Sequence, residues 1–310
     1  MPEPDMSVWT GRVDMADGPR ALRWHQMVKP LTPRCRPGLV LIGFACDEGV
    51  RRNGGRIGAR DGPRAIRAAL ANLAWHQECP VYDAGDVRCD DGDMERAQSR
   101  LAEVVATAIT AGHRPLVLGG GHETAWGTFQ GITAAKPKAA VGVINIDAHF
   151  DLRADNPGNS GTPFYQIAKW YEKHGQPFRY LCLGVAEPSN TSAIFDRALQ
   201  LGVDWVTDRN CHYLLSDAVL KRILAFLQTA DLLHVSIDLD VLPGKTMPAV
   251  SAPAARGVPL EYLESLLELV LHNGRVASVE LVELNPLHDI DGQGARVAAW
   301  LANHVALQFH

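Results

Sequence analysis

The feature that most constrains the fold is the alternation of short, unbroken apolar runs with amphipathic segments along the chain. Unbroken apolar runs are typical of strands that are covered on both faces, as in parallel sheets. Eight strands are expected, over residues 39–46, 81–86, 115–120, 140–146, 180–185, 205–207, 232–238 and 277–284. Amphipathic helices are expected between them, among others over residues 95–111, 217–229, 260–273 and 294–309.

Strands that alternate with helices form right-handed βαβ units and one mainly parallel sheet. No linker, internal repeat or low-complexity tract interrupts the 310 residues. We therefore predict an α/β protein with a single domain over residues 38–310. Residues 1–37, which are rich in proline, are expected to form an irregular leader that packs on this domain.

Composition narrows the class of partner. The net charge of −5 comes without a basic stripe or an acidic block, which argues against nucleic acid or an anionic membrane as a partner. The first residues, MPEPDMSVWTGR, lack the pattern of a signal peptide. No apolar stretch reaches the roughly 20 residues that span a bilayer. We expect a cytoplasmic protein that acts on a small molecule.

Acidic and imidazole side chains follow four of the predicted strands. In open parallel sheets, ligands bind at the carboxyl ends of the strands. The four segments at these ends are Gly121-His122-Glu123, Asp147-Ala148-His149-Phe150-Asp151, Asp238-Leu239-Asp240 and Glu283-Leu284-Asn285-Pro286. The sequence therefore predicts a polar site at one edge of the sheet.

The spacing within these segments predicts a metal site. Asp147, His149 and Asp151 alternate, so an extended segment would point all three the same way. A lone segment of this kind is usually a surface loop, but three of them at strand ends favour metal binding. Carboxylates and imidazoles without a thiolate favour manganese, and so many ligands indicate a two-metal centre. The predicted ligands are His122, Asp147, His149, Asp151, Asp238 and Asp240.

At these residues the chain resembles the ureohydrolase family, which comprises arginases, agmatinases and formimidoylglutamases. The motifs GGGHE, DAHFD, SIDLD and VELNP occur in the family's order between about residues 115 and 286. The resemblance implies a three-layer α/β/α sandwich around an eight-stranded, mainly parallel sheet. It also implies self-association into a homo-oligomer.

The resemblance also distributes the ligands between two manganese ions per subunit. One ion would take His122, Asp147, Asp151 and Asp238. The other would take Asp147, His149, Asp238 and Asp240, so that Asp147 and Asp238 bridge the ions. Glu283 lies where the family places a carboxylate against the guanidinium or amidine group of the substrate; the alternative is a solvated glutamate at a strand end.

Within the family, the chain is most similar to formimidoylglutamases. The element SGTPF includes Ser160 at a position where arginases and agmatinases typically carry a histidine. Arg153 after DAHFD and the segments 52–59 and 251–254 also resemble formimidoylglutamases. The substrate of these enzymes has two carboxylates, for which arginine provides bidentate recognition. The predicted substrate-binding residues are Arg153, Ser160, Gly161, Arg52, Asn53 and Arg56, with a structural role as the alternative for the arginines.

The resulting hypothesis is hydrolysis of N-formimidoyl-L-glutamate to L-glutamate and formamide, a step in histidine degradation. A hydroxide that bridges the metals would attack the amidine carbon, with Asp151 orienting the hydroxide and Glu283 holding the amidine. Two alternatives remain open at this point. One is a ureohydrolase for a guanidine substrate such as agmatine or guanidinobutyrate, and the other is a non-catalytic metal-binding protein on the same scaffold.

Overall fold

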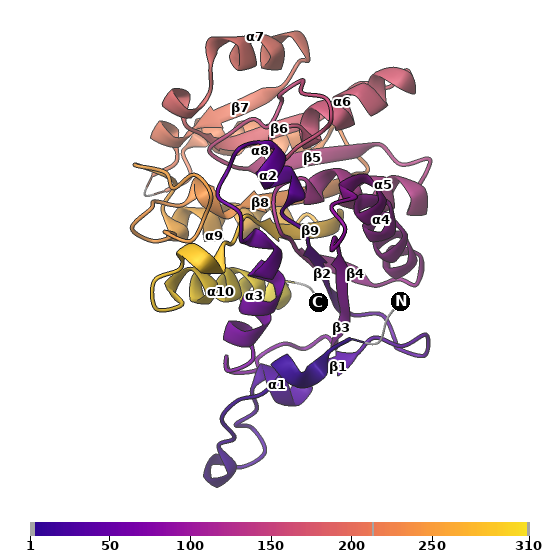
Figure 1. The fold of residues 1–310 in the computed structure, drawn as a ribbon, viewed down its shortest axis with the longest axis vertical. Coiled ribbons are helices and arrows are strands. Elements are labelled where there is room, and N and C mark those ends of the chain that lie inside the picture. Colours follow the sequence, from indigo (N-terminus) through magenta and orange to yellow (C-terminus); the bar gives the residue numbers. More distant parts are fainter. Residues whose placement is uncertain (1–3, 213, 309–310) are drawn as a thin grey trace.

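A computed structural model describes residues 4–212 and 214–308. Within this part of the chain, nine strands form one sheet in the order β1-β3-β2-β4-β9-β8-β5-β6-β7, and all neighbouring strands run parallel (Figure 1). The strands are β1 (Lys29–Pro30), β2 (Leu39–Ala45), β3 (Val81–Arg88), β4 (Arg114–Leu118), β5 (Val141–Ile146), β6 (Tyr180–Val185), β7 (Asp204–Thr207), β8 (Leu232–Asp238) and β9 (Val276–Val282).

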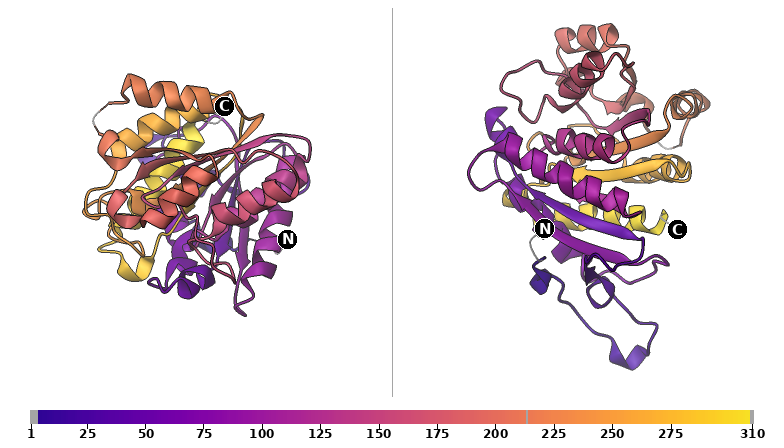
Figure 2. Two further views of the ribbon diagram at one scale, coloured as in Figure 1. Left: turned by 90° about the horizontal axis from the view of Figure 1, so that it is seen from above. Right: turned by 90° about the vertical axis from the view of Figure 1, so that its right-hand side faces the viewer.

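Helices cover both faces of the sheet, so the molecule has three layers (Figure 2). One layer contains α1 (Trp24–Met27), α3 (Gly62–Leu70), α8 (Asp217–Leu227), α9 (Leu260–Leu271) and α10 (Gln293–Gln308). The other contains α4 (Met94–Thr110), α5 (Thr124–Ala135), α6 (Pro163–Lys173) and α7 (Ser192–Gln200). The short helix α2 (Glu48–Arg52) follows β2.

Successive side chains of a central strand point to opposite faces of the sheet, and helices cover both faces. This explains why a strand such as β5 is apolar along nearly its whole length. In β5, Val143 packs in the core on the α4–α7 side, whereas Ile144 and Ile146 pack in the core on the opposite side. Because both faces are covered, both sets of side chains are apolar. Ser236 in β8 and Glu280 in β9 are exceptions, since both are fully buried polar residues.

The predicted strands are present as β2 to β9, with ends that shift by no more than two residues. The predicted number of eight strands is too low by one, because β1 of the leader pairs with β3. β1 has only two residues and one of them is a proline, so no apolar run marks it. Helices α4, α8, α9 and α10 match the predicted helices; residue 309 of the last one lies outside the described residues.

Tryptophans attach the leader to the sheet and to α10. The indole N–H of Trp9 donates to Asp83 Oδ2 over 2.8 Å, beside a buried ion pair between Asp83 and Arg67. Trp24 is fully buried and donates to Asn303 Oδ1 over 3.0 Å. Among residues 4–212 and 214–308, the helices lack the combination of length and apolar character that a membrane span requires.

Candidate metal centre

The six predicted ligands meet at the carboxyl edge of the central strands. Asp147 directly follows β5 and Asp238 ends β8, whereas His122 lies between β4 and α5. Glycines allow this close approach: a Cβ on Gly120 would collide with the carbonyl oxygen of Cys46. The prediction of one polar edge therefore agrees with the positions of these side chains.

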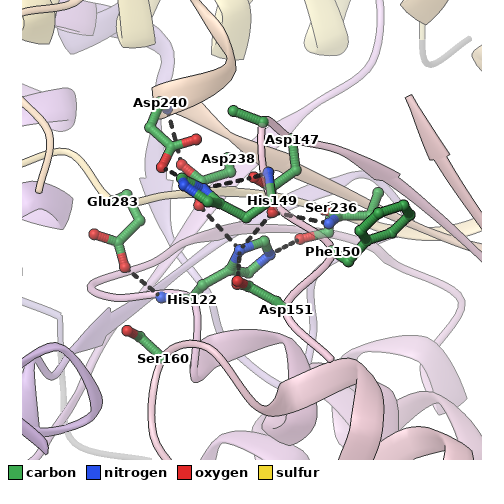
Figure 3. Close-up of polar contacts among 12 residues, drawn as sticks. His122, Asp147, His149, Phe150, Asp151, Ser160, Ser236, Asp238, Asp240 and Glu283 are labelled. Atoms are coloured by element: carbon green, nitrogen blue, oxygen red, sulfur yellow. Dashed lines mark hydrogen bonds and ion pairs between the residues drawn. The ribbon is translucent and has the colours of Figure 1, made fainter. Parts of the chain in front are cut away.

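The first group of potential ligands surrounds His122 (Figure 3). Its Nδ1 lies 2.9 Å from Asp151 Oδ2, 3.0 Å from Asp238 Oδ2 and 3.3 Å from Asp147 Oδ2. The His122 side chain is only 1% exposed. This group, which we call the inner group, consists of His122, Asp147, Asp151 and Asp238.

The second group surrounds His149, nearer to solvent. His149 Nδ1 lies 3.1 Å from Asp240 Oδ2 and 3.5 Å from Asp147 Oδ1, and the His149 side chain is 26% exposed. This outer group consists of Asp147, His149 and Asp240. The two groups share Asp147, whose two carboxylate oxygens face different histidines, whereas Asp238 lies with the inner group.

The residues of both groups fit a cation better than they fit one another. Three carboxylates surround one nitrogen of His122, but a single N–H can point at only one of them. Burial and the charge of Asp240 raise the pKa of Asp238 well above its usual value, and burial and Asp147 raise that of Asp240 to about 6. Buried carboxylates of this kind are stabilised by a metal ion. Oxygen ligands with two imidazoles and no thiolate suit manganese.

A buried chain of polar residues orients the ring of His122. His122 Nε2 lies 2.8 Å from Ser236 Oγ, and Ser236 donates to Glu280 Oε1 over 2.7 Å. His234 Nε2 lies 3.1 Å from the same oxygen of Glu280. Because the Ser236 hydroxyl donates to Glu280, it accepts from His122, which places the proton on Nε2. The Nδ1 lone pair then faces the carboxylates, where a metal would bind.

Glu283 presents one free carboxylate oxygen to the site. Its Oε1 accepts from the backbone N–H of His122 over 2.8 Å, whereas its buried Oε2 has no hydrogen-bond partner among the described residues. Glu283 has a φ of 71° and Asp151 one of 47°, in the left-handed region that such residues rarely adopt. Burial and the charge of Asp238 raise the pKa of Glu283. The raised pKa favours the neutral carboxyl, and a cationic ligand at the unpartnered Oε2 would favour the ionised form, which accepts its hydrogen bond.

A cleft of about 320 Å³ opens onto both groups and onto a separate polar wall. Its lining combines the metal-site residues His149, Asp151, Asp238, Asp240 and Glu283 with Asn53, Arg153, Ser160, residues 189–191 and residues 251–252. The cleft is large enough for a small molecule to contact both the metal groups and the polar wall.

Arg153 extends along the polar wall beside Gly161. The N–H of Arg153 donates to the carbonyl of Gly161 over 2.9 Å, and a Cβ on Gly161 would lie 2.7 Å from Arg153 Cδ. Gly161 therefore leaves room for the arginine side chain. Asn53 donates to Ser160 Oγ over 3.1 Å. Among the described residues, the guanidinium of Arg153 has no hydrogen bond or ion pair, so it is available to a ligand.

Arg52 and Arg56 lie outside the set of described residues that line the cleft. Arg52 forms an ion pair with Glu95 at 2.6 Å and donates to the carbonyl of Gly158 over 3.1 Å. Arg56 donates to the carbonyls of Val250 and Ser251. For these two arginines, the observed contacts match the structural alternative rather than the predicted contact with substrate, because their guanidinium groups already hold neighbouring loops together.

Comparison with known proteins gives the family. A model of the arginase family matches residues 37–308. The chain belongs to this family. Its curated relatives include proteins named formimidoylglutamase from Chromobacterium violaceum, 54% identical over 299 residues and 96% of each chain, and from Aeromonas hydrophila, 52% identical over 305 residues and 97% of each chain.

Solved structures of two proteins have the same fold as this chain. Formimidoylglutamase from Bacillus subtilis has a TM-score of 0.85 at 22% identity, over 96% of this chain and 94% of that chain. Formiminoglutamase from Trypanosoma cruzi with Mn²⁺₂ has a TM-score of 0.78 at 29% identity, over 88% and 93%. The predicted arginase-like fold and the resemblance to formimidoylglutamases are confirmed.

In this arginase-family chain, the sequence prediction missed residues that support the site. Asn145 donates to Asp147 Oδ2 over 2.9 Å, and Ser236 and Glu280 orient His122. A signal for them exists, because each is a polar residue inside a strand that is otherwise mainly apolar. Residues 189–191 were also missed, although they follow a predicted strand at the same edge as the ligands.

Proposed function

We propose that the chain is a manganese-dependent hydrolase that cleaves N-formimidoyl-L-glutamate to L-glutamate and formamide. One observation carries the proposal: the metal groups and the available guanidinium of Arg153 face the same small cleft. The relatives named formimidoylglutamase, which are about half identical over nearly the whole chain, support the same substrate.

The groups of this chain have separate tasks in the reaction. Two manganese ions held by the inner and outer groups would provide the nucleophile at neutral pH, because they lower the pKa of water. Asp151, which lines the cleft, accepts a hydrogen bond from the attacking oxygen and orients it. Glu283 accepts from the cationic amidine through its available Oε2. These contacts place the amidine carbon within reach of the nucleophile.

Binding of the amidine is also expected to change the pKa of Glu283. Burial and neighbouring carboxylates raise its pKa in the empty cleft. A bound amidinium favours the ionised form of the carboxylate and so lowers that pKa. An ionised Glu283 with its available Oε2 therefore pairs with the cationic amidine.

The polar wall binds the glutamate part of the substrate. The planar guanidinium of Arg153 can donate two parallel hydrogen bonds to one carboxylate. Asn53 donates to Ser160 Oγ, so the hydroxyl proton of Ser160 is free to donate to the substrate as well. Gly161 provides the space for the Arg153 side chain. Gly161 is not one of the described residues that line the cleft.

The resemblance to the family carries three further parts of the proposal. We propose that the enzyme acts in the cytoplasm, that it takes part in histidine degradation and that it forms a homo-oligomer. Its partner is the small-molecule substrate, with no role for nucleic acid or membrane. Each of these rests on the family and on composition rather than on the geometry of the site.

The proposal is tested with purified protein loaded with manganese. We expect formamide release from N-formimidoyl-L-glutamate, and no comparable hydrolysis of arginine, agmatine or guanidinobutyrate. Urea release from a guanidine substrate at a similar rate would contradict the assignment of substrate. Absence of turnover with every substrate, in protein that holds two ions, would favour the non-catalytic alternative.

A further inference from the structure

Asn190 joins the loop that carries three potential ligands, residues 147–151, to the loop after β6. Its amide Nδ2 donates to the carbonyls of Ala148 and Ala186, each over 2.9 Å. Its Oδ1 accepts from the backbone N–H of Phe150 over 3.1 Å. One side chain therefore forms three hydrogen bonds to backbone groups, two of them in the ligand loop.

These contacts lie on either side of His149, the histidine of the outer group. Ala148 and Phe150 are its neighbours in sequence, so Asn190 fixes the backbone before and after His149. The Ala148 carbonyl also accepts from the backbone N–H of Ala186 over 2.9 Å. His149 itself has a hydrogen bond from its N–H to Asp147 Oδ1 and a sulfur contact from Cys182 to its carbonyl at 3.4 Å. Sulfur is a weak donor, and the Ala186 bond reaches only the residue before His149. Asn190 is the side chain that holds the backbone both before and after His149.

The remainder of the loop has separate attachments. Tyr180 donates to the carbonyl of Phe150 over 2.9 Å, and Arg197 donates to the carbonyl of Leu152 over 2.6 Å. These two contacts hold the backbone on both sides of Asp151, a member of the inner group. Loss of Asn190 would therefore loosen the backbone at His149 more than the backbone at Asp151.

We propose that Asn190 is a positioning residue that holds His149 for the outer of the two metal ions. The inference rests on the proposed metal centre, but its effect on the backbone exists without metal. Residues that orient a ligand from outside the coordination sphere typically change metal affinity by about 10–100-fold. We expect a change of this size at the outer ion, with little change at the inner one.

The test compares Asn190→Ala with Asn210→Ala in the full chain. Asn210 lies in the loop after the neighbouring strand β7 and donates one hydrogen bond, to Thr207 Oγ1 over 3.1 Å. It is therefore a matched control whose amide holds only its own loop. Asn190→Asp is a second variant, which keeps the acceptor for Phe150 but turns a carboxylate toward two carbonyl oxygens. It tests the donor role if the alanine variant folds poorly.

Two readouts separate the inference from the proposed function. In metal-free protein, amide hydrogen exchange over residues 147–151 should be faster in both Asn190 variants than in wild type or Asn210→Ala. In manganese titrations followed by electron paramagnetic resonance, wild type should show two coupled ions. The Asn190 variants should show a single uncoupled ion until about 10–100-fold more manganese is added.

Unchanged exchange in this loop, or an equal loss of both ions together with a general loss of stability, would overturn the role of Asn190. Coupled ions at wild-type affinity in both Asn190 variants would also overturn it. A wild-type protein that binds fewer than two ions overturns the proposed metal centre, and with it the inference. Faster exchange with selective loss of the outer ion supports the inference.

Discussion

The inner and outer groups position their histidines in different ways. The ring of His122 is buried and held through its second nitrogen by Ser236, which is in turn held by Glu280. His149 is partly exposed, and the hydrogen bonds next to it, from Asn190 and from the Ala186 N–H, hold the backbone rather than the ring. A ring fixed by side chains and a ring fixed by its loop respond to different substitutions, so the two metal positions can be disturbed separately.

The largest effect is expected for Asp147, the potential ligand that the inner and outer groups share. Asp147→Asn removes a carboxylate from both groups. We expect loss of both ions and a fall in formamide release of at least about 10³-fold, because metal catalysis contributes several kcal/mol to the transition state. Metal analysis and steady-state kinetics check this. Two ions per chain in the variant would show that Asp147 is not shared.

Ser236→Ala should disturb the inner ion alone. It removes the hydroxyl between His122 and Glu280 and leaves the buried Nε2 of His122 without its partner, whereas Glu280 still faces His234. We expect about 10–100-fold weaker binding of the inner ion and a loss of stability of about 1–3 kcal/mol. Manganese titration and chemical denaturation measure the two effects. Equal weakening of the outer ion would argue against separate support of the two histidines.

Arg153→Ala should leave both ions in place and affect the substrate. Arg153 belongs to neither metal group, so the metal content should stay at two ions per chain. Loss of charge-assisted hydrogen bonds worth about 1.5–3 kcal/mol predicts a rise in KM of about 10–100-fold. Arg179→Ala, at the amino end of β6, is the control. An unchanged KM would remove Arg153 from the substrate site.

Tyr180→Phe is expected to have the smallest effect. It removes the hydroxyl that donates to the carbonyl of Phe150 and accepts from Asn145, while the ring keeps its stacking on Phe164. We expect a stability loss of about 1 kcal/mol, seen as a lower Tm, with two ions still bound. Selective weakening of the inner ion would show that this attachment of Asp151 matters more than its geometry suggests.

Much of this architecture follows from local sequence. β5 is visible as a nearly unbroken apolar run because helices cover both of its faces, whereas β8 alternates Leu233, Val235 and Ile237 with buried polar residues. The ligands are visible because DAHFD and the acids of SIDLD directly follow these strands. β1 is too short to leave a pattern, and its pairing with β3 depends on tertiary packing of the leader.

The hydrogen-bond and ion-pair partners of individual side chains could not be predicted from local sequence in the same way. Arg52 and Arg153 both looked like candidates for substrate contact, but Arg52 finds Glu95, 43 positions away, whereas Arg153 finds no such partner among the described residues. Asn190 lies 40 and 42 positions from the two loop residues, Phe150 and Ala148, that it holds. Such choices depend on the distances between loops in the folded chain, which no local pattern encodes.

The most direct test of the account is anomalous X-ray diffraction at the manganese edge from crystals of the protein loaded with Mn²⁺. The account predicts two peaks that both lie next to Asp147. One should be surrounded by His122, Asp151 and Asp238, and the other by His149 and Asp240. A single peak, or two peaks that do not share Asp147, would contradict it.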